Sequence, residues 1–259
     1  MLQKLKSFVQ LIIQNILGYR TYLYVFSIYR TLKFRLLRDD ADFNIFIDLV
    51  KSHQPATIID AGANVGYTAV IFAKEFPHYS IIAYEPVSLL STIIKKVVLF
   101  FNVRNVTVKQ LALGNANNKV SIKTPIISGV KKQGLSFIDV AVEREDANLL
   151  NNFLEEQVQM VTLDADLIGN VLNPIVGIKV DVENFEFFVL QGTVELIKLY
   201  KPLVMAELWD NERKNACIEL MESLGYRVKV IRNKALIDYT NQQSLNYFFI
   251  PNKNNFNTD

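Results

Sequence analysis

The sequence contains very few of the side chains that bind metals or form disulfides. Cys217 is the only cysteine among the 259 residues, so no disulfide can form within the chain. The two histidines, His53 and His78, form no zinc-ligand pattern with it. We therefore expect no zinc site and assign no metal ligands, while a divalent metal shared by clustered carboxylates stays open as an alternative. The lone thiol fits a reducing compartment, which we take to be the cytoplasm.

Two common glycine motifs of nucleotide-binding sites are missing as well. Gly62 and Gly66 have no glycine between them, so the turn that holds them does not match the G-x-G-x-x-G fingerprint of nicotinamide-dependent enzymes. The turn also lacks the lysine of a phosphate-binding P-loop. We keep an NAD-dependent oxidoreductase as an alternative because Glu85 would hold the ribose of either cofactor.

A strand, turn, helix and second strand are nevertheless indicated around these glycines. An apolar run at 57–61 leads through the turn into a helical pattern at about 66–76, and a second apolar run at 80–85 ends in Glu85. An α/β sheet builds a nucleoside pocket in this order, with the turn close to the ligand and the acid on the ribose hydroxyls. The alternative is a glycine turn that only connects a strand to a helix.

The turn favours a ligand that has both a nucleoside and a positively charged centre. Asp60 precedes the turn, which leaves no clearance for a pyrophosphate. S-adenosylmethionine has the favoured combination. We expect Asp60 and the backbone of the turn to hold its amino-acid end, and Glu85 to hold the ribose. The residues of this predicted cofactor site are Asp60, Gly62, Asn64, Gly66, Glu85 and Pro86.

Apolar runs alternate with helical patterns along most of the chain, which predicts an α/β fold with a doubly wound, mainly parallel sheet. Strands are expected at about 57–61, 80–85, 106–108, 175–181, 203–207, 226–231 and 247–250, and helices at about 41–52, 66–76, 88–101, after 181 and at 211–223. Residues 115–160 break the alternation. There, strands at 120–123 and 137–142 flank a segment at 128–134 that we expect to be a mobile loop.

Four of the expected strands end in an acid. These acids are Asp60, Glu85, Asp181 and Glu207. Ligands of such sheets bind beyond the carboxyl ends of the strands, so the four acids predict one site. Both histidines precede strands and fall at the opposite edge, so we expect neither to be a catalytic base.

The base is therefore expected to be Asp181, Glu183 or Glu207, because clustered acids raise one another's pKa toward neutrality. Lys179 lies two residues before Asp181 and points to the same side of the strand. It either keeps a catalytic acid ionised or forms a structural ion pair. Glu186 is expected to interact with the dipole of the helix that it begins.

Residues 1–52 are interpreted as an N-terminal helical arm. Residues 1–38 include seven basic and no acidic side chains, whereas acids outnumber bases in the rest of the chain. Apolar residues from Leu5 to Tyr29 recur mostly at three- and four-residue intervals, typical of an amphipathic helix, but polar residues interrupt any membrane span. The arm is expected to lie on the inner face of an anionic membrane, or to pack on the domain or on a second subunit, which leaves a homo-oligomer open.

Taken in order, several segments resemble the FkbM family of S-adenosylmethionine-dependent methyltransferases. The matching segments are 59–67, 83–86, 111–114, 162–164, 178–186, 189–192, 202–207 and 224–226. The resemblance covers about residues 57–232. The chain departs from the family at Asn184, where glycine is usual, but asparagine tolerates left-handed backbone better than most residues, so the turn can survive.

The resemblance implies a Rossmann-like methyltransferase domain at 53–251, with an irregular insertion at about 115–160 and a tail at 252–259. It also adds Ala112 and Leu113 to the cofactor site. The implied reaction is methyl transfer to a hydroxyl of a sugar or another natural product, and our interpretation places it in polysaccharide biosynthesis.

For this reaction we expect Asp181 to be the base or the acceptor-binding acid, supported by Glu183, Glu207 and Lys179. The loop at 128–136 is expected to select the acceptor, a small molecule or glycan. Nucleic acid is not expected, because the chain beyond the arm is acidic and shows no basic, aromatic-lined strip. The non-enzymatic alternative is a membrane-surface adaptor that keeps the fold and binds partners through the arm.

Overall fold

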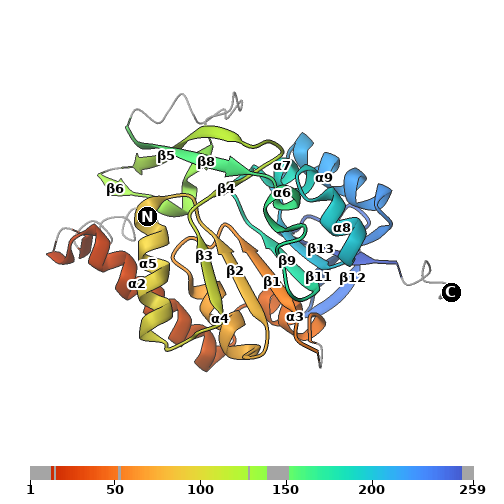
Figure 1. Ribbon diagram of the computed structural model, residues 1–259, viewed down its shortest axis with the longest axis horizontal. Coiled ribbons are helices and arrows are strands. Elements are labelled where there is room, and N and C mark those ends of the chain that lie inside the picture. The colour runs from red at the N-terminus through yellow and green to blue at the C-terminus, as the bar shows by residue number, and fades with distance from the viewer. Residues whose placement is uncertain (1–12, 15, 52–53, 128, 139–151, 253–259) are drawn as a thin grey trace.

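The computed structural model describes residues 13–14, 16–51, 54–127, 129–138 and 152–252. Its centre is an eight-stranded sheet in the order β12-β11-β13-β10-β9-β1-β2-β3 (Figure 1). The strands from β10 to β3 are parallel neighbours, and β13, β11 and β12 extend the sheet in antiparallel pairs. The expected α/β fold with a doubly wound, mainly parallel sheet is confirmed.

The strands and helices have the following bounds. The strands of the central sheet are β1 Thr57–Ala61, β2 Ser80–Tyr84, β3 Val106–Lys109, β9 Ile175–Val180, β10 Leu203–Glu207, β11 Tyr226–Arg232, β12 Ala235–Asp238 and β13 Asn246–Pro251. The helices are α2 Tyr19–Leu37, α3 Ala41–Leu49, α4 Tyr67–Glu75, α5 Ser88–Phe100, α6 Leu163–Leu167, α7 Glu186–Gln191, α8 Val194–Tyr200 and α9 Glu212–Ser223. The sequence patterns did not predict β12.

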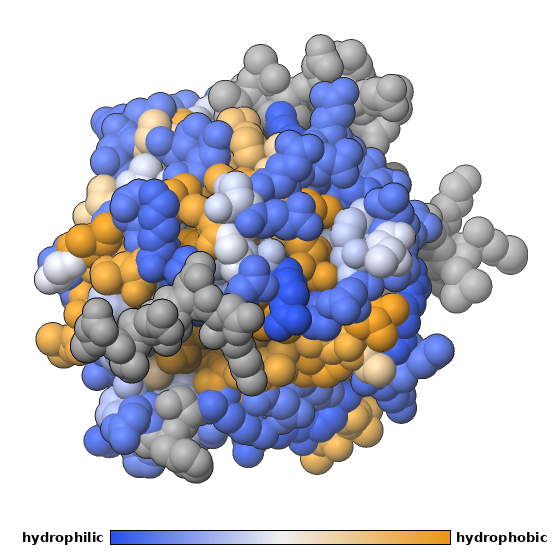
Figure 2. Space-filling view, turned by 90° about the vertical axis from the view of Figure 1, so that its right-hand side faces the viewer, coloured by the Kyte–Doolittle hydropathy of each residue, from blue (hydrophilic) through white to orange (hydrophobic). Residues whose placement is uncertain are grey.

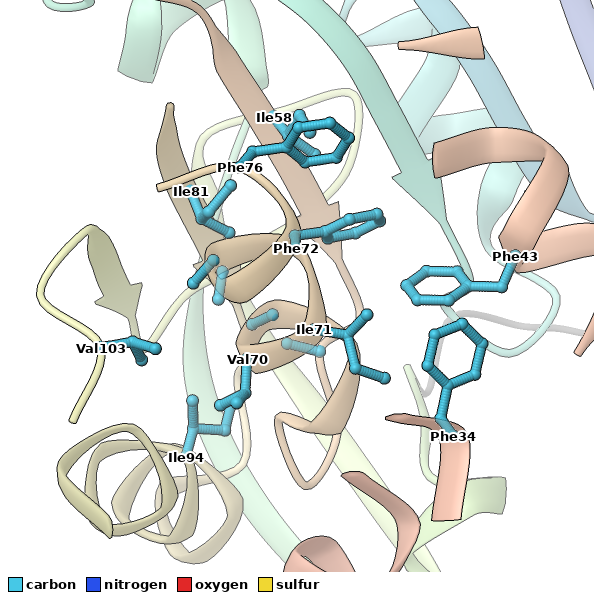
Figure 3. Packing of buried hydrophobic residues seen from close by; sticks show 14 of the residues in the cluster. Phe34, Phe43, Ile58, Val70, Ile71, Phe72, Phe76, Ile81, Ile94 and Val103 are labelled. Carbon is cyan, nitrogen blue, oxygen red and sulfur yellow. The ribbon is translucent and has the colours of Figure 1, made fainter. Parts of the chain in front are cut away.

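Alternate residues of the parallel strands enter two hydrophobic cores. Ile58 packs in a core with α2, α3, α4 and α5, whereas Ile59 packs on the other face with α6, α7, α8 and α9. In the first core the Phe43 ring lies 5.2 Å from the Phe34 ring and 4.7 Å from the Phe72 ring, between centroids (Figure 3). Helices on both faces explain why these strands are continuous apolar runs in the sequence.

Strands within residues 112–138 and 152–161 form a second, smaller sheet beside the end of β3. Its strands are β4 Ala112–Leu113, β5 Asn118–Ile127, β6 Val130–Lys131, β7 Phe137–Ile138 and β8 Phe153–Val161. The sequence did not predict β8, a mostly polar strand in which Val158 and Met160 are buried. The segment expected as a loop at 128–134 contains β6 and the start of a 3₁₀ helix, η1 (Gln133–Leu135). The part of the expected strand at 139–142 lies outside the described residues.

The described part of the arm packs on the domain. Its helix α2 begins directly after Gly18. The apolar spacing predicted one continuous helix, but the φ of 74° at Gly18 interrupts it. Residues 1–12 lie outside the described part. Leu23 is fully buried, and the Ser27 hydroxyl donates a hydrogen bond of 2.7 Å to the carbonyl of Val65. Helix α2 therefore contributes to the first core and reaches the glycine turn.

The surface carries apolar side chains among hydrophilic ones, as on the face shown in Figure 2. Several exposed apolar residues belong to α2, including Tyr29 and Leu36. None of the helices within the described residues is long and apolar enough to cross a membrane.

We expect Leu23→Ala to destabilise the protein by about 2–5 kcal/mol, because it leaves a cavity in a closed core. The control Leu36→Ala changes a residue of the same helix that is 80% exposed, and its effect should stay within about 0.5 kcal/mol. Urea unfolding of both variants measures the change in the free energy of unfolding. Equal, small effects would show that α2 does not belong to the core.

Candidate active site

The four acids at strand ends lie along one edge of the sheet. Asp60 and Glu207 lie within the last two residues of β1 and β10, and Glu85 and Asp181 directly follow β2 and β9. These four strands are parallel neighbours in the order β10-β9-β1-β2, so their carboxyl ends lie side by side. His78 is exposed before β2, at the opposite edge, whereas His53 lies outside the described residues.

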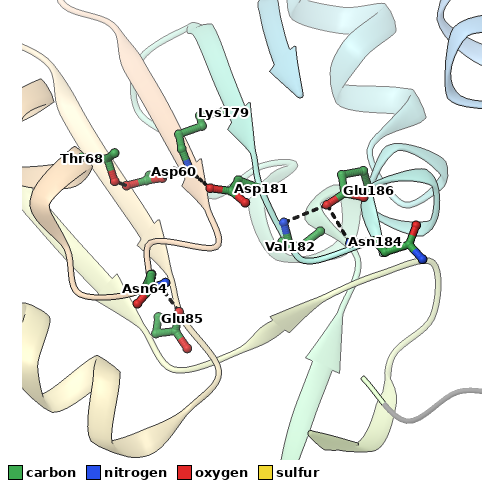
Figure 4. Close-up of polar contacts among 9 residues, drawn as sticks. All are labelled: Asp60, Asn64, Thr68, Glu85, Lys179, Asp181, Val182, Asn184 and Glu186. Carbon is green, nitrogen blue, oxygen red and sulfur yellow. Dashed lines mark hydrogen bonds and ion pairs between the residues drawn. The ribbon is translucent and has the colours of Figure 1, made fainter. Parts of the chain in front are cut away.

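A buried ammonium group joins two of the acids (Figure 4). Lys179 Nζ lies 3.2 Å from Asp181 Oδ2 and 3.4 Å from Asp60 Oδ1, and only 7% of the lysine is exposed. Burial by itself would lower the pKa of Lys179, but the carboxylates of Asp181 and Asp60 outweigh it and raise the pKa above the usual value. Lys179 therefore stays charged, which suits an ion-pair role and not that of a base.

Asp60 differs from the sequence-based expectation. It has no exposed surface, and its Oδ2 accepts a hydrogen bond of 2.5 Å from the Thr68 hydroxyl. A side chain enclosed in this way does not reach a ligand, so direct contact with the amino-acid end of a cofactor does not fit the geometry. Asp60 instead anchors Lys179, and through Lys179 it helps to position Asp181.

The glycine turn lies directly against the end of β9. Gly62 has a φ of 80°, and a Cβ atom there would lie 1.8 Å from the carbonyl oxygen of Asp181. Gly66 has a φ of 81°, and its Cβ would lie 2.9 Å from the side chain of Ile94. Both positions need glycine for packing. The sequence analysis explained the glycines only by the close approach of the turn to a ligand.

Glu85 lies in a cavity beside the turn. Its two carboxylate oxygens accept hydrogen bonds of 2.9 Å from the backbone N–H groups of Asn64 and Val87 (Figure 4 shows the Asn64 bond). Burial raises the pKa of Glu85 to about 8, although these two N–H groups oppose the shift. The carboxyl is thus held in place by backbone on both sides and titrates near neutral pH.

The cavity around Glu85 lies between the two sheets; we call it the donor cavity. It brings together most of the expected cofactor residues, namely Gly62, Asn64, Glu85, Pro86, Ala112 and Leu113. Gln133 and Ser136, which belong to the loop at 128–136 that the sequence analysis expects to select the acceptor, line this cavity as well. The sequence analysis missed Tyr84, a wall residue whose hydroxyl donates to Asp166. The contact between Tyr84 and Asp166 joins residues that are far apart in the sequence, so no local pattern indicates it.

Asp181 lies between the donor cavity and a second, polar cavity. It lines both, while Glu183 lines the donor cavity and Glu207 lines the polar one. Burial, followed by the charge of Asp181, raises the pKa of Glu207 to about 7. The three candidate bases are therefore distributed around one point, with Asp181 at the centre.

The loop after Asp181 is held in a left-handed conformation. Glu183 and Asn184 have φ values of 57° and 69°, so Asn184 does adopt the left-handed backbone that the sequence analysis expected asparagine to tolerate. The buried Glu186 accepts hydrogen bonds from the N–H groups of Val182 (3.0 Å) and Asn184 (3.2 Å) (Figure 4). Glu186 thus fixes the loop, a role beyond the helix-dipole contact expected from the sequence.

Two side chains at the start of α9 also hold this loop. Arg213 donates a hydrogen bond of 2.8 Å to the carbonyl of Asn184, and the Asn211 amide donates one of 2.8 Å to the side chain of Asn184.

In the described part of the chain, no group of three or more His, Cys, Asp or Glu residues is arranged to hold a metal ion.

We expect Lys179→Met to destabilise the protein by about 3–5 kcal/mol, because it leaves the carboxylate of Asp60 buried without a cation. The double variant Asp60→Asn/Lys179→Met should lose about 1–3 kcal/mol less than the sum of the single losses. Urea unfolding of the three variants gives this coupling, and strictly additive losses would contradict the ion pair.

Comparison with known proteins agrees with the resemblance seen in the sequence. The family model of the methyltransferase FkbM domain matches residues 60–228, well over half of the chain. A protein of Beauveria bassiana named methyltransferase 1 is 27% identical over 222 residues, which cover 80% of this chain and 88% of the relative.

Solved structures with a similar chain path include two methyltransferases. The FkbM methyltransferase of Methylobacillus flagellatus matches with 13% identity and a TM-score of 0.47 over 88% of this chain, which spans 54% of the length of that protein. A SAM-dependent O-methyltransferase of Thermotoga maritima matches with 9% identity and a TM-score of 0.46, over 86% of this chain and 71% of its own. On the match of the family model, the chain belongs to the FkbM methyltransferase domain family.

Proposed function

We propose that this protein transfers the methyl group of S-adenosylmethionine to a hydroxyl oxygen of a sugar or another small natural product. The observation that carries the proposal is the position of Asp181, where a cavity lined by the glycine turn and Glu85 meets a second, polar cavity. Membership of the FkbM family supports methyl transfer as the reaction class.

The residues of the donor cavity fit the proposed cofactor. The Glu85 carboxyl keeps unused lone pairs for the ribose hydroxyls, since each oxygen accepts only one backbone bond within the described residues. Asn64 Oδ1 is buried and has no hydrogen-bond partner among the described residues, so it offers an acceptor for the amino group of the cofactor. Leu111, Ala112 and Leu113 provide an apolar wall for the adenine.

In this proposal the bound cofactor supplies an electrophilic methyl group, and the chain supplies alignment and a proton acceptor. Holding the two reactants in line is worth an effective molarity of about 10⁵ M or more in favourable cases. Asp181 accepts the proton of the acceptor hydroxyl, while Lys179 keeps its carboxylate in place. Glu207, on the far side of Asp181, is placed to bind further acceptor hydroxyls.

The affinity for S-adenosylhomocysteine should rise with pH, by about tenfold between pH 6.5 and 8.5. The pKa of Glu85 is raised to about 8, so the carboxyl is protonated at the lower pH, whereas the ribose hydroxyls donate best to its ionised form. Calorimetry across this pH range on the wild type and Glu85→Gln measures the effect. The variant should bind more weakly at pH 8.5 and lack this rise. The same rise in both proteins would show that another group titrates.

Asp181→Asn should lower the turnover number by about 10²–10⁴ through loss of the proton acceptor. Donor affinity should change by less than threefold, since the amide keeps the shape of the side chain. Turnover is measured as S-adenosylhomocysteine release with an acceptor found in a sugar screen. The control Asp48→Asn alters an exposed carboxyl on α3. Turnover of Asp181→Asn close to that of the control would refute the role.

We also propose that α2 rests on an anionic membrane surface. Its outward face carries an exposed apolar stripe at helical spacing, made of Val25, Tyr29, Leu32 and Leu36. Arg20 and Arg35 are exposed on the same helix, and residues 1–38 include no acid to repel anionic lipids. The opposite face, with Leu23 and Phe34, is buried against the domain.

Co-sedimentation with vesicles tests this surface. The wild type should bind vesicles that contain phosphatidylserine, and 0.5 M salt should weaken the binding because salt screens the arginine contacts. The pair Leu32→Ser/Leu36→Ser should reduce binding, while Leu199→Ser, an exposed control on α8, should not. Absence of salt-sensitive binding by the wild type would contradict the proposal.

A further inference from the structure

An open groove lies beside the donor cavity, between α2 and η1. We call it the arm groove. Its lining residues are Phe26, Arg30, Asn64, Val65, Tyr67, Lys132, Gln133, Gly134 and Leu135. Asn64 and Gln133 line the donor cavity as well, so the two spaces meet at these side chains.

Contacts between α2 and the η1 segment build the groove. The Tyr19 hydroxyl donates a hydrogen bond of 3.3 Å to Gln133 Oε1, and Lys131 Nζ lies 4.8 Å from the centroid of the Tyr19 ring. Gly134 lies close to Asn64, because a Cβ atom there would come within 3.7 Å of the Asn64 amide nitrogen. The arm and the second sheet therefore form one wall each, and the glycine turn forms the floor.

Two cationic side chains line the groove. Arg30 and Lys132 are among its lining residues, which include no acid. The Arg30 guanidinium lies 4.9 Å from the centroid of the Tyr67 ring, and within the described residues it forms no ion pair with a carboxylate. The Arg30 side chain also hydrogen-bonds to Tyr67, but a guanidinium carries five N–H donors, so others remain for a ligand.

The other side of Tyr67 has the opposite charge. Tyr67 also lines the polar cavity, together with Asp40, Asp42 and Glu207. A ligand that reaches Asp181 from outside therefore meets cations on one side of Tyr67 and carboxylates on the other. An anionic group is favoured only on the side of Arg30.

We propose that the arm groove binds the phosphate of a phosphorylated sugar, the acceptor of the proposed methyl transfer. Arg30 holds the phosphate oxygens, because a guanidinium matches them bidentately, and Lys132 on the opposite wall adds a second cation to the lining. The sugar then extends past Asn64 toward Asp181. This inference rests on the proposed function for the identity of the reaction, but the groove and its charge stand without it. It makes α2 part of the substrate site, although α2 lies outside the residues that the family model matches.

Binding of phosphate probes to the full-length protein tests the groove. The protein, with and without saturating S-adenosylhomocysteine, is titrated with glucose 1-phosphate, UDP-glucose and free glucose, and binding is followed by calorimetry and ³¹P NMR. We expect both phosphate compounds to bind, with the preferred one identifying a monoester or a nucleotide sugar, and free glucose to bind at least about tenfold more weakly.

Two variants and a control assign the binding to this groove. Arg30→Gln and Lys132→Gln should each weaken phosphate binding by about tenfold, whereas S-adenosylhomocysteine affinity stays within about twofold. Arg104→Gln, which removes an exposed cation elsewhere, should leave both unchanged. Thermal melting of each variant checks that it is folded.

Failure of the groove and failure of the proposed function give different results. Equal phosphate affinity in the wild type and both groove variants, or no phosphate binding by the wild type, would overturn the phosphate proposal. Absence of S-adenosylhomocysteine binding would instead contradict the proposed methyl transfer. The titrations without S-adenosylhomocysteine would still show whether the arm groove binds phosphate.

Discussion

The candidate site depends on the buried ammonium of Lys179. Without that cation, two carboxylates would lie close together at the ends of β1 and β9, and one of them, Asp60, is fully enclosed. The ion pairs join the two strand ends, and the backbone of Gly62 packs against Asp181 at the same place. The glycine turn and Asp181 thus form one unit, and every cavity of the site is arranged around it.

Three spaces with different polar side chains surround that unit. The donor cavity lies on the side of Glu85, the polar cavity on the side of Glu207, and the arm groove on the side of Arg30. Asp181 lies at the boundary of the first two, and Asn64 at the boundary of the donor cavity and the groove. An enzyme that brings two ligands to one point requires such an arrangement, because each ligand needs its own recognition chemistry.

Much of the sheet and the acids at its edge could be predicted from the sequence. Strands β1, β2, β9 and β10 are buried on both faces and are therefore continuous apolar runs. Packing of the arm on the domain was one of the expected alternatives, but the burial of Asp60, the position of η1 and the particular contacts of α2 could not be predicted. They depend on contacts between distant segments, such as Ser27 with Val65, and no local periodicity encodes such contacts. Strand β8 was missed because only Val158 and Met160 are buried along it.

The most direct test of the account is a calorimetric titration of the wild-type protein with S-adenosylmethionine, S-adenosylhomocysteine and NAD. The account predicts micromolar binding of both adenosyl compounds at one site and no heat with NAD, because the turn around Gly62 leaves no clearance for a pyrophosphate. Binding of NAD alone would favour an oxidoreductase. Folded protein that binds none of the three would contradict the proposed methyl transfer and favour a protein that acts only through its arm.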